Sequence, residues 1–499
     1  MFEKVLIANR GEIALRIIRT ASEMGMQTVA VYSDADKASL HVAAANEAVP
    51  LGASDPASSY LNIDKIIAAA LTTGCEAIHP GYGFLSENPL FAEKVVSEGL
   101  VFIGPPAQVM AELGDKTRAR EIMTGGGVPV IPGMVEASDD PALLIQQAST
   151  LGYPVLVKAA AGGGGKGMRI VSSPAELLEA AQSASSEACT AFGDGRIYLE
   201  KYLDRPRHIE FQIVGDSYGN VIHFFERECS IQRRHQKIIE ETPSTALDED
   251  LRGRMAEAAL AGGKAAGYIN AGTVEFLLDA SGKFYFLEVN TRLQVEHPIT
   301  EMTTGIDLVR LQMNVAARQP LSLSQKDIVK RGHSIECRIY AEDPESNFMP
   351  TPGRIVYAKY PEGPGVRFDH CFYSGFEVPV HYDPILGKLV VWAEDRPAAI
   401  ARMIRALKDC VILGIKTQIE FLLDVLSSDA FRRGDIHTQL IDNDFAGWGV
   451  RRDVDRLAAV AYSGYDILRP RKVAKLQEAS HGQGFPSPWQ TLGSWDFCT

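Results

Sequence analysis

The 499-residue sequence lacks several features that would assign it to another class of protein. Its seven cysteines are scattered, and no two of them form a CxxC pair. This pattern indicates reduced thiols and argues against a disulfide framework or a zinc site. No run of about 18 apolar residues occurs, so no transmembrane helix is predicted. The N-terminal MFEKVLIANRGE enters a strand at once and has no signal-peptide core. We therefore expect a cytoplasmic protein.

Positive charge is also in short supply. The formal net charge of -13 argues against non-specific binding to nucleic acid or to an anionic membrane. Any anion site must therefore be a local concentration of lysine and arginine. The turn around Gly11 lacks the full GxGxxG pattern of dinucleotide-binding sites, and no Walker A motif GxxxxGK[ST] occurs, since Gly167 follows Lys166 in the glycine-rich loop. What remains is a chain of ordinary globular composition that is long enough for two to four domains.

The stretch from Phe284 to Pro298, FYFLEVNTRLQVEHP, alternates polar and apolar residues and so predicts one extended strand. The odd positions, from Tyr285 to Val295, are mostly apolar and are predicted to be buried. The even positions form a polar face that carries Glu288, Asn290, Arg292, Gln294 and Glu296.

A second strand, Gly272 to Asp279, is predicted to pair with this one through the turn 280–283. Pairing Asp279 with Phe284 places Glu275 opposite Glu288, roughly 5 Å away, where like charges repel. A divalent cation such as Mg²⁺ between the two carboxylates would remove that repulsion. The alternative is an exposed acidic hairpin face, but the polar residues in phase beyond Glu288 favour the metal site.

The order of predicted elements suggests several domains. A strand at 5–8, a helical pattern through Met24 and a strand at 28–32 form a βαβ unit, which predicts a parallel sheet. We expect residues 1–113 to form one α/β domain with mainly a scaffold role. The other predicted units are a second region at 114–203 that includes a lid at about 131–203, a catalytic domain at 204–320, a C-terminal domain at 333–447 and a partly mobile extension at 448–499.

A glycine-rich loop lies between two predicted strands. YPVLVK, at 153–158, is followed by AAAGGGGKGMR, which holds five glycines between residues 162 and 167. Such a backbone has few steric limits and many free N–H groups, so it can close over phosphate oxygens, with Lys166 and Arg169 adding charge. A plain linker is the alternative, but the flanking strands favour a hinged phosphate lid on a small domain.

The run from Glu226 to Thr242, ERECSIQRRHQKIIEET, is the densest basic cluster. In an acidic chain it is the best candidate for binding small anions, and a solvated charged face is the alternative. Further along, SIECRIYA at 334–341 alternates in the same way and places Arg338 on a polar strand face directed toward the same site. The cationic residues of the run are Arg227, Arg233, Arg234, His235 and Lys237.

Six motifs occur in order: IANRGEIALR, HPGYGFLSEN, GGGGKGMR, QRRHQK, EVNTRLQVEHPITE and ECRIYAEDP. Together they resemble the biotin carboxylase component of biotin-dependent carboxylases, a family of ATP-grasp enzymes, over residues 1 to about 447. The resemblance implies an α/β ATP-grasp fold with an N-terminal parallel, Rossmann-like domain, a small glycine-rich lid domain and a C-terminal mixed-sheet domain. It also implies that MgATP phosphorylates bicarbonate to carboxyphosphate and that the carboxyl group then passes to N1 of biotin, as the first half-reaction of an acyl-CoA carboxylase.

The same resemblance implies a role for individual residues. The residues that would hold ATP are Lys116, Lys158, Gly164, Gly165, Met168, Glu200, Lys201, Tyr202, Leu203, His208, Gln232, His235, Glu275 and Glu288. Those that would hold Mg²⁺ or Mn²⁺ are Glu275, Glu288 and Asn290. Those that would hold bicarbonate are Lys237, Arg292, Gln294 and the backbone of Val295. The catalytic residues would be Lys237, Arg292, Glu296 and Arg338.

Elementary chemistry is consistent with these roles. Phosphoryl transfer depends on positioning and charge neutralisation, which lysines and a metal ion supply. Bicarbonate must lose a proton, and Glu296 is in reach as the base. Biotin N1 becomes nucleophilic only if the ureido oxygen can carry negative charge, and a fixed cation such as Arg338, which would face the biotin ring, stabilises that oxyanion.

The implied partners are a biotin carboxyl carrier protein, carboxyltransferase subunits and a second copy of the chain in a homodimer. None of the 12 methionines is followed by lysine, so the biotin-accepting lysine is expected on a separate carrier. The carboxyltransferase selects the final acyl or keto acid acceptor, which this sequence therefore does not specify. Two other functions stay open: a biotin-independent ligase that joins a carboxylate to an amine, and a silent nucleotide-binding subunit. The first would not require Lys237, Glu296 and Arg338 together, and the second would be expected to lose a metal ligand or Lys158.

Overall fold

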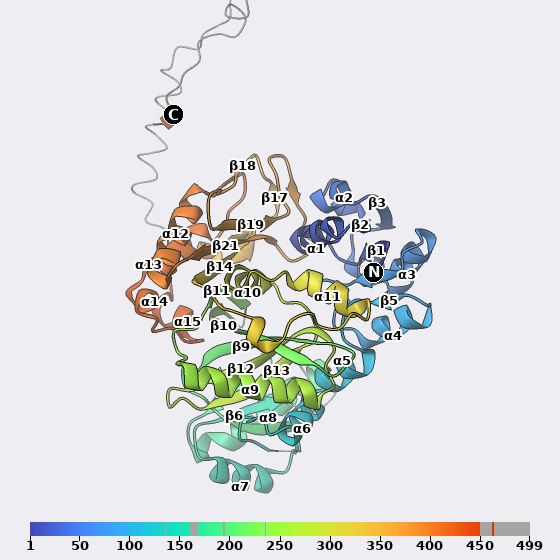
Figure 1. Cartoon of the computed structure of the whole chain (residues 1–499). Helices are drawn as coiled ribbons and strands as arrows, with labels where there is room; N and C mark the ends of the chain where they lie inside the picture. Colours follow the sequence, from blue (N-terminus) through green and yellow to red (C-terminus); the bar gives the residue numbers. More distant parts are fainter. Residues whose placement is uncertain (135, 160–167, 193–194, 235, 450–461, 464–499) are drawn as a thin grey trace, which may run out of the picture. The chain divides into compact units, whose positions relative to one another are not determined.

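The computed structural model describes residues 1–134, 136–159, 168–192, 195–234, 236–449 and 462–463. Residues Met1–Gly449 form one structural unit and Val450–Thr499 a second, and the elements below belong to the first (Figure 1). The glycine-rich loop with Gly164 and Gly165, residue His235 and nearly all of the predicted extension lie outside the described residues. Within the described part of the chain, none of the helices combines the length and the apolar character needed to cross a bilayer.

The N-terminal region is a parallel sheet of five strands in the order β3-β2-β1-β4-β5, which confirms the predicted βαβ start. Its central strands are apolar and buried, as expected where helices cover both faces of a sheet. The strands are β1 (Lys4–Ile7), β2 (Gln27–Ser33), β3 (Glu47–Gly52), β4 (Ala77–His79) and β5 (Val101–Phe102). The helices are α1 (Gly11–Glu23), α2 (Leu40–Ala44), α3 (Ile63–Thr72), α4 (Pro89–Ser97) and α5 (Ala107–Gly114).

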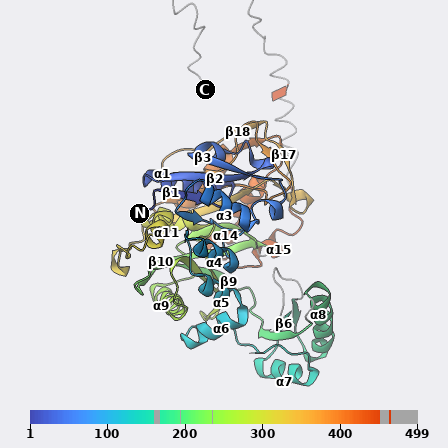
Figure 2. The same ribbon diagram turned by 90° about the vertical axis from the view of Figure 1, so that its right-hand side faces the viewer.

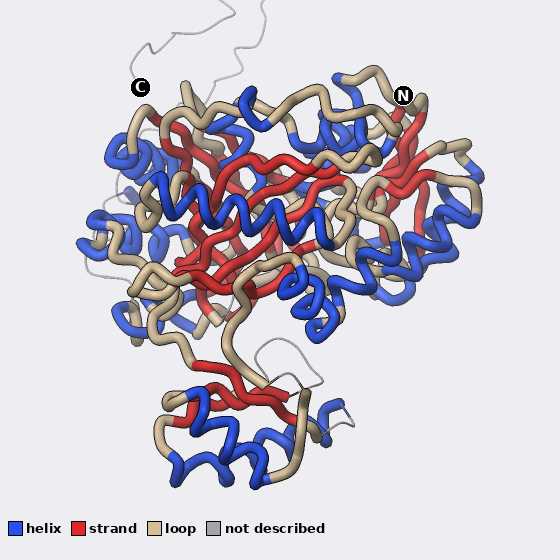
Figure 3. The backbone as a smooth tube through the Cα atoms, turned by 60° about the horizontal axis from the view of Figure 1, so that its bottom comes forward, coloured by secondary structure: helices blue, strands red, loops and turns tan. Residues whose placement is uncertain are grey.

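A small lid domain follows helix α6 (Lys116–Gly125). Figures 2 and 3 show its sheet beside two helices. The strand order is β7-β6-β8, and the two layers enclose a hydrophobic core of their own. The predicted strand before the glycine-rich loop and the strand after it are therefore neighbours in one antiparallel sheet. The elements are α7 (Pro141–Leu151), β6 (Val155–Ala159), β7 (Arg169–Val171), α8 (Leu177–Phe192) and β8 (Ile197–Lys201).

The largest element is an antiparallel sheet of eight strands in the order β13-β12-β9-β10-β11-β14-β21-β19. It joins the predicted catalytic and C-terminal regions in one continuous sheet, because β11 pairs directly with β14. Helix α9 (Glu249–Ala265) lies across one face of its central strands (Figure 3). The strands are β9 (Arg207–Gly215), β10 (Val221–Arg233), β11 (Gln236–Thr242), β12 (Asn270–Leu278), β13 (Phe284–Asn290), β14 (His333–Tyr340), β19 (Val366–His370) and β21 (Ile385–Ala393).

Strand β14 shows how this sheet separates core from site. Its odd positions, such as Cys337, join a hydrophobic core that includes residues of helix α12. Since side chains alternate along a strand, its even positions, Glu336 and Arg338, face the other way. The remaining helices are α10 (His297–Thr304), α11 (Leu308–Ala316), α12 (Arg396–Asp409), α13 (Ile419–Ser427), α14 (Asp429–Arg433) and α15 (Leu440–Asp444). The short strands are β15 (Glu342–Asp343), β16 (Met349–Pro350), β17 (Gly353–Arg354), β18 (Tyr357–Lys359), β20 (Glu377–Val378) and β22 (Val411–Leu413).

The predicted single strand from Phe284 to Pro298 is wrong in its second half, because β13 ends at Asn290 and helix α10 begins at His297. The predicted register was also one residue off at the turn, where Leu278 pairs with Phe284. An irregularity between Glu275 and Phe276 then restores the predicted pairing of Glu275 with Glu288. The buried face changes phase with it: Phe284 and Phe286 are buried before the irregularity, and Val289 is buried after it.

Close packing at the end of β9 generates a stability prediction. A Cβ atom added at Gly215 would lie 2.0 Å from the backbone oxygen of Tyr268, so Gly215→Ala should lower the free energy of unfolding by roughly 1–3 kcal/mol or more. Gly253→Ala is the matched control, because nothing lies within 4 Å of the added atom on α9. There alanine should stabilise the protein by up to about 1 kcal/mol. Urea unfolding measures both values, and equal effects of the two variants would contradict the described packing.

Candidate active site

The ammonium group of Lys237 is the centre of a cluster of carboxylates. Lys237 extends from β11, and its Nζ donates to Glu210 Oε2 at 2.6 Å, Glu275 Oε1 at 2.8 Å and Glu296 Oε1 at 2.7 Å. An ammonium group has three donors, so all three are used. Burial alone would lower the pKa of Lys237, but the three carboxylates outweigh it and hold that pKa well above the usual value. The lysine is therefore a fixed positive charge.

Glu275, on β12, is the most heavily bonded of these carboxylates. Its Oε1 also accepts from Asn290 Nδ2 and from Gln294 Nε2, each at 2.8 Å, and its Oε2 lies 3.0 Å from His208 Nε2. Burial opposes ionisation of Glu275, but the charges of Lys237 and His208 are stronger and lower its pKa well below the usual value. This carboxylate is therefore ionised.

Glu288 faces Glu275 across the hairpin, as predicted. Among the described residues, no side chain hydrogen-bonds to it. The negative charge of Glu275 and then burial raise the pKa of Glu288. Glu275 is paired with Lys237 and His208, whereas the opposed Glu288 has no such partner among the described residues. Two carboxylates in this arrangement suit a hard divalent cation, which prefers oxygen ligands. The residues present therefore fit the predicted Mg²⁺ or Mn²⁺ site of Glu275, Glu288 and Asn290.

Arg292 connects this hairpin to the N-terminal domain. Its Nη2 donates to Asn290 Oδ1 at 2.8 Å, and its Nε donates to Glu87 Oε2, also at 2.8 Å. Glu87 lies in the turn before α4, and its other oxygen accepts from the backbone N–H of Thr291 at 3.1 Å. The N-terminal domain, predicted to be mainly a scaffold, thus contributes a side chain to the site. The bond to Thr291 also marks where the chain leaves the sheet after Asn290.

Arg338, on β14, reaches the same cluster from the opposite side. Its Nη2 donates to Glu296 Oε2 at 3.1 Å, and its Nε donates to Glu240 Oε1 at 2.6 Å. Glu296 therefore touches Lys237 through one oxygen and Arg338 through the other. Burial would raise the pKa of Glu296, but these two cations lower it below the usual value. The neighbouring Val295 offers its backbone oxygen to Lys388 Nζ at 2.8 Å.

The predicted basic cluster of residues 226–242 does not act as one anion site. Arg227 is fully buried, and its guanidinium is taken up by protein acceptors, including Gln212 at 2.8 Å and Gln294 at 2.7 Å. Arg233 stacks over the ring of Phe348 at 4.1 Å, and Arg234 donates to Asn347 at 2.9 Å. Of the described cationic residues in this run, Lys237 and Arg227 contact the carboxylate cluster, Arg227 through an ion pair with Glu210. Arg233 and Arg234 are directed elsewhere.

The described ATP residues predicted in the lid are bonded to protein groups, and two of them, Lys158 and Glu200, are bonded to each other. Lys158, at the end of β6, forms an ion pair with Glu200 on β8, and Arg120 Nη1 donates to the other oxygen of Glu200 at 3.0 Å. Lys201 Nζ donates to the backbone oxygen of Gly152 at 2.7 Å, and the hydroxyl of Tyr202 accepts from Gln439 at 2.7 Å. The other described members are Lys116 at the start of α6, Met168 before β7, Leu203 after β8, His208 on β9 and Gln232 on β10.

Several residues of the site were missed as site residues. Except for Glu336, each of them hydrogen-bonds to a predicted residue or its backbone. Two carried a signal, because Glu210 is in phase with His208 and Glu336 is in phase with Arg338 along their strands. The others depend on contacts between distant segments, which spacing does not reveal. The missed residues are Glu87, Arg120, Glu210, Glu240, Glu336 and Lys388.

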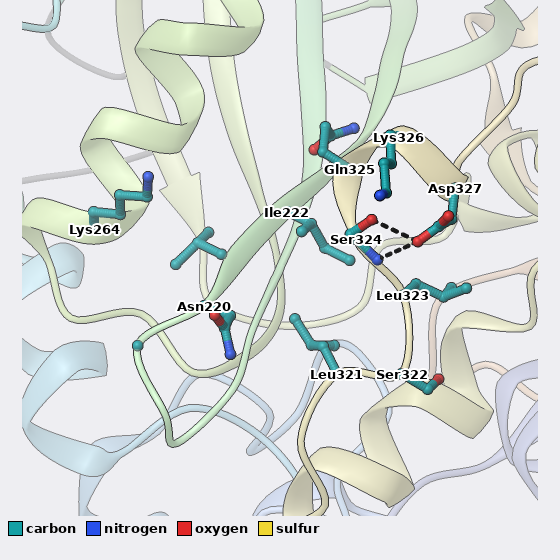
Figure 4. Close-up of a pocket in the computed structure, with 12 residues that line it drawn as sticks. Asn220, Ile222, Lys264, Leu321, Ser322, Leu323, Ser324, Gln325, Lys326 and Asp327 are labelled. Carbon is teal, nitrogen blue, oxygen red and sulfur yellow. Dashed lines mark hydrogen bonds between the residues drawn. The ribbon is translucent and has the colours of Figure 1, made fainter.

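A separate hollow of about 710 Å³ opens between the β9–β10 turn and segment 321–327. Figure 4 shows Lys264 and Lys326 at its edges and the hydrogen bonds between Ser324 and Asp327. None of the predicted site residues lines it. The candidate active site is therefore the carboxylate and cation cluster on the eight-stranded sheet.

Three family models match the chain. They are "Biotin carboxylase, N-terminal domain" over residues 1–110, "Carbamoyl-phosphate synthase L chain, ATP binding domain" over residues 115–324 and "Biotin carboxylase C-terminal domain" over residues 336–443. Together they span most of the first structural unit.

Known relatives agree with these matches. The chain is 52% identical over 440 residues to a biotin carboxylase of Nostoc, covering 88% of this chain and 98% of the relative. It is also 52% identical to a pyruvate carboxylase subunit of Methanothermobacter thermautotrophicus, covering 89% and 90%. A similar solved structure is the biotin carboxylase domain dimer of the Hydrogenobacter thermophilus 2-oxoglutarate carboxylase with MgADP, ADP and bicarbonate. It is 46% identical, has a TM-score of 0.85 and covers 90% of this chain and 99% of its own.

Removing the central cation should reverse the pH dependence of stability. In the wild-type protein, the lowered pKa values of Glu275 and Glu296 contribute stability above their unfolded-state pKa, and that stability is lost as the pH falls through the folded-state values. Lys237→Met leaves buried carboxylates without their shared cation, which should cost roughly 3–5 kcal/mol at pH 7. Protonation relieves that repulsion, so the variant should regain stability between about pH 7 and pH 5, where the wild type does not.

Urea unfolding at several pH values measures this difference. Lys264→Met is the control, because Lys264 is exposed on α9 and has no part in the cluster. A Lys237→Met variant whose stability follows the wild-type pH dependence would show that the three carboxylates do not depend on this lysine.

Proposed function

The chain belongs to the biotin carboxylase family of ATP-grasp enzymes, and from this membership we propose the role of each residue around Lys237 and Glu296. The enzyme catalyses the MgATP-dependent carboxylation of biotin with bicarbonate, by way of carboxyphosphate. Neither the biotin-independent ligase nor the silent subunit that the sequence left open describes this family. The assignment of steps to residues, which follows, is our proposal.

The observation that carries the proposal is that Glu296 lies between two cations. We assign bicarbonate to the Lys237 side, with Arg292, Gln294 and the backbone of Val295, and biotin to the Arg338 side. Because all three donors of Lys237 are bonded, an incoming bicarbonate must replace one of the carboxylates there. Glu296 is ionised and can accept the bicarbonate proton as a general base. One residue thus serves both half-sites.

The hairpin and the lid would supply the phosphate chemistry. Glu275, Glu288 and Asn290 would hold Mg²⁺ or Mn²⁺, which neutralises charge on the ATP phosphates when it is bound. Lys116 and Lys158 would add positive charge to the same phosphates. Lys158 is paired with Glu200 in this structure, so it must exchange that partner for phosphate. The other ATP roles predicted from the sequence, including those of Gly164, Gly165 and His235, stay predictions.

Arg338 is proposed to face the ureido oxygen of biotin. The anion that forms when biotin N1 loses its proton places negative charge on that oxygen, and a fixed guanidinium stabilises the charge. Gln418 fixes the backbone from Arg338 to Tyr340, since it donates to the oxygen of Arg338 at 2.9 Å and accepts from the N–H of Tyr340 at 2.7 Å. The cation is therefore held in position before biotin arrives.

We propose the same partners that the sequence implied. Biotin would arrive on a separate carrier protein, and a carboxyltransferase would use the carboxylated carrier. A homodimer is proposed because the Hydrogenobacter thermophilus domain is a dimer. The free cysteines of the described residues support a cytoplasmic location. The final acceptor differs among the relatives, one of which is a pyruvate carboxylase subunit, and the domain boundaries given above remain predictions.

Glu288→Gln tests the metal hairpin. The substitution removes one charged oxygen ligand at the reacting phosphates, so metal-dependent ATP cleavage should fall by at least about 10²-fold. The measurement is ATP cleavage over a range of Mg²⁺ concentrations, with Glu257→Gln on α9 as the control. Unchanged activity and unchanged Mg²⁺ dependence in Glu288→Gln would rule out Glu288 as a ligand.

Glu296→Ala and Arg338→Gln separate the two halves of the reaction. Without the base, both ATP cleavage in the presence of biotin and carboxybiotin formation should fall together. Without Arg338 the phosphate and bicarbonate groups stay in place, but carboxybiotin formation should fall on the order of 10²-fold or more. Bicarbonate-dependent ATP cleavage should persist in Arg338→Gln, so that turnover becomes uncoupled.

Phosphate release and carboxybiotin are measured side by side with free biotin as the acceptor. The proposed division of roles fails if Arg338→Gln lowers both products equally, or if Glu296→Ala alone uncouples them.

A further inference from the structure

Glu336 is a buried carboxyl group that the proposed mechanism does not use. It lies on β14, two residues before Arg338, and its residue is 0% exposed. Neither of its carboxyl oxygens has a hydrogen-bond partner among the described residues. An ionised carboxylate left in this state would cost several kcal/mol, because nothing replaces its lost hydration. Glu336 must therefore be satisfied in another way.

The nearby cations among the described residues pair with other groups and not with Glu336. Lys388, on the adjacent strand β21, donates to the backbone oxygen of Val295 at 2.8 Å and lies 3.3 Å from Glu12 Oε2. Arg338, on the same strand as Glu336, is bonded to Glu240 and Glu296. Neither of these two cations forms an ion pair with Glu336. A neutral, protonated Glu336 is the remaining way to satisfy the group.

Glu240 provides the matching acceptor. It stands directly opposite Glu336 in the pairing of β11 with β14, where opposed side chains are about 5 Å apart at Cβ. Glu240 Oε1 accepts from Arg338 Nε at 2.6 Å, whereas Glu240 Oε2 is buried without a partner among the described residues. A single O–H from Glu336 to Glu240 Oε2 would satisfy an unpaired group on each residue.

We propose that Glu336 and Glu240 share one proton directly behind Arg338, and that this carboxyl pair positions the guanidinium for biotin. Glu240 stays ionised and aligns Nε of Arg338, and the neutral Glu336 holds Glu240. The pair then carries a single negative charge, which avoids the repulsion between two ionised carboxylates. Both glutamates are positioning residues that act through Arg338. The inference rests on the role proposed above for Arg338.

Electrostatics supports the shared proton. Burial, then the charge of Glu240, raises the pKa of Glu336 well above the usual value. Burial also raises the pKa of Glu240, although the charge of Arg338 opposes the shift. The groups that act on Glu336 come from each neighbouring element: Glu240 on β11, Lys388 on β21, Arg338 on β14 and Glu296 before α10. Loss of the second proton from the pair is therefore unfavourable at neutral pH.

Infrared difference spectroscopy on the full-length chain tests the proton directly. The wild-type protein at neutral pH should show the carbonyl band of a protonated carboxylic acid, and Glu336→Gln should remove it. Glu226→Gln is the matched control, because Glu226 is equally buried but is ion-paired to Arg252 at 2.9 Å. That variant should remove no such band. Absence of the band in the wild type, or its persistence in Glu336→Gln, would overturn the proposal.

Activity with free biotin tests the positioning role. The amide of Glu336→Gln can still donate to Glu240, so carboxybiotin formation should stay within about 3-fold of the wild type. Glu336→Leu removes the donor, so carboxybiotin formation should fall on the order of 10-fold, with a smaller loss of bicarbonate-dependent ATP cleavage. Equal losses in Glu336→Gln and Glu336→Leu would overturn the proposal, because the negative charge of Glu336 would then be the required feature.

The two measurements also separate this proposal from the preceding one. The infrared band reports only the protonation of Glu336 and does not depend on which substrate Arg338 contacts. The shared proton would therefore still be supported if Arg338→Gln failed to uncouple the reaction. If Glu336→Leu does not fold, Glu336→Gln and the infrared spectra still decide the outcome.

Discussion

The arrangement of the site depends on one ammonium group that three carboxylates share. Glu210, Glu275 and Glu296 come from two different strands and from the loop after a third, and Lys237 comes from a fourth. Without that cation the strands would bring like charges together in a buried place, which is strongly unfavourable. With it, each of these three carboxylates is held in place by a hydrogen bond from the ammonium group. Glu288 has no hydrogen-bonded side chain among the described residues, and this carboxylate is the one proposed to complete a site for a divalent metal ion.

The eight-stranded sheet places the groups proposed for the successive steps of the reaction next to one another. From β13 across to β14, its strands carry in order the proposed metal ligands, the central lysine and the arginine proposed for biotin. Adjacent strands in a sheet are about 4.8 Å apart, so groups on one face are held at chemically useful separations. The reaction partners can therefore be bound side by side on one rigid surface. The lid has a hydrophobic core of its own.

Much of this arrangement could be predicted from residue patterns. Alternation in the hairpin predicted the opposition of Glu275 and Glu288, although the register at the turn was one residue off and a local irregularity compensated for it. Alternation failed beyond Asn290, because periodicity does not show where backbone hydrogen bonds pass to a distant group such as Glu87. Grouping by sequence also misled in the run 226–242, where Arg227 and Lys237 contact the carboxylate cluster but Arg233 and Arg234 contact Phe348 and Asn347. The partners Glu240 and Glu336 follow from strand order, which the sequence alone does not provide.

The pairing of β11 with β14 has a consequence for how the chain can be divided. A fragment that ended before His333 would leave β11 as a sheet edge with unpaired backbone groups and exposed isoleucines, a common starting point for aggregation. The C-terminal strands thus protect the catalytic sheet in addition to supplying Arg338. Contacts between these segments are distant in sequence, so they form late and depend on the whole chain being present. A boundary between domains in the sequence is therefore not a boundary at which this protein can be cut.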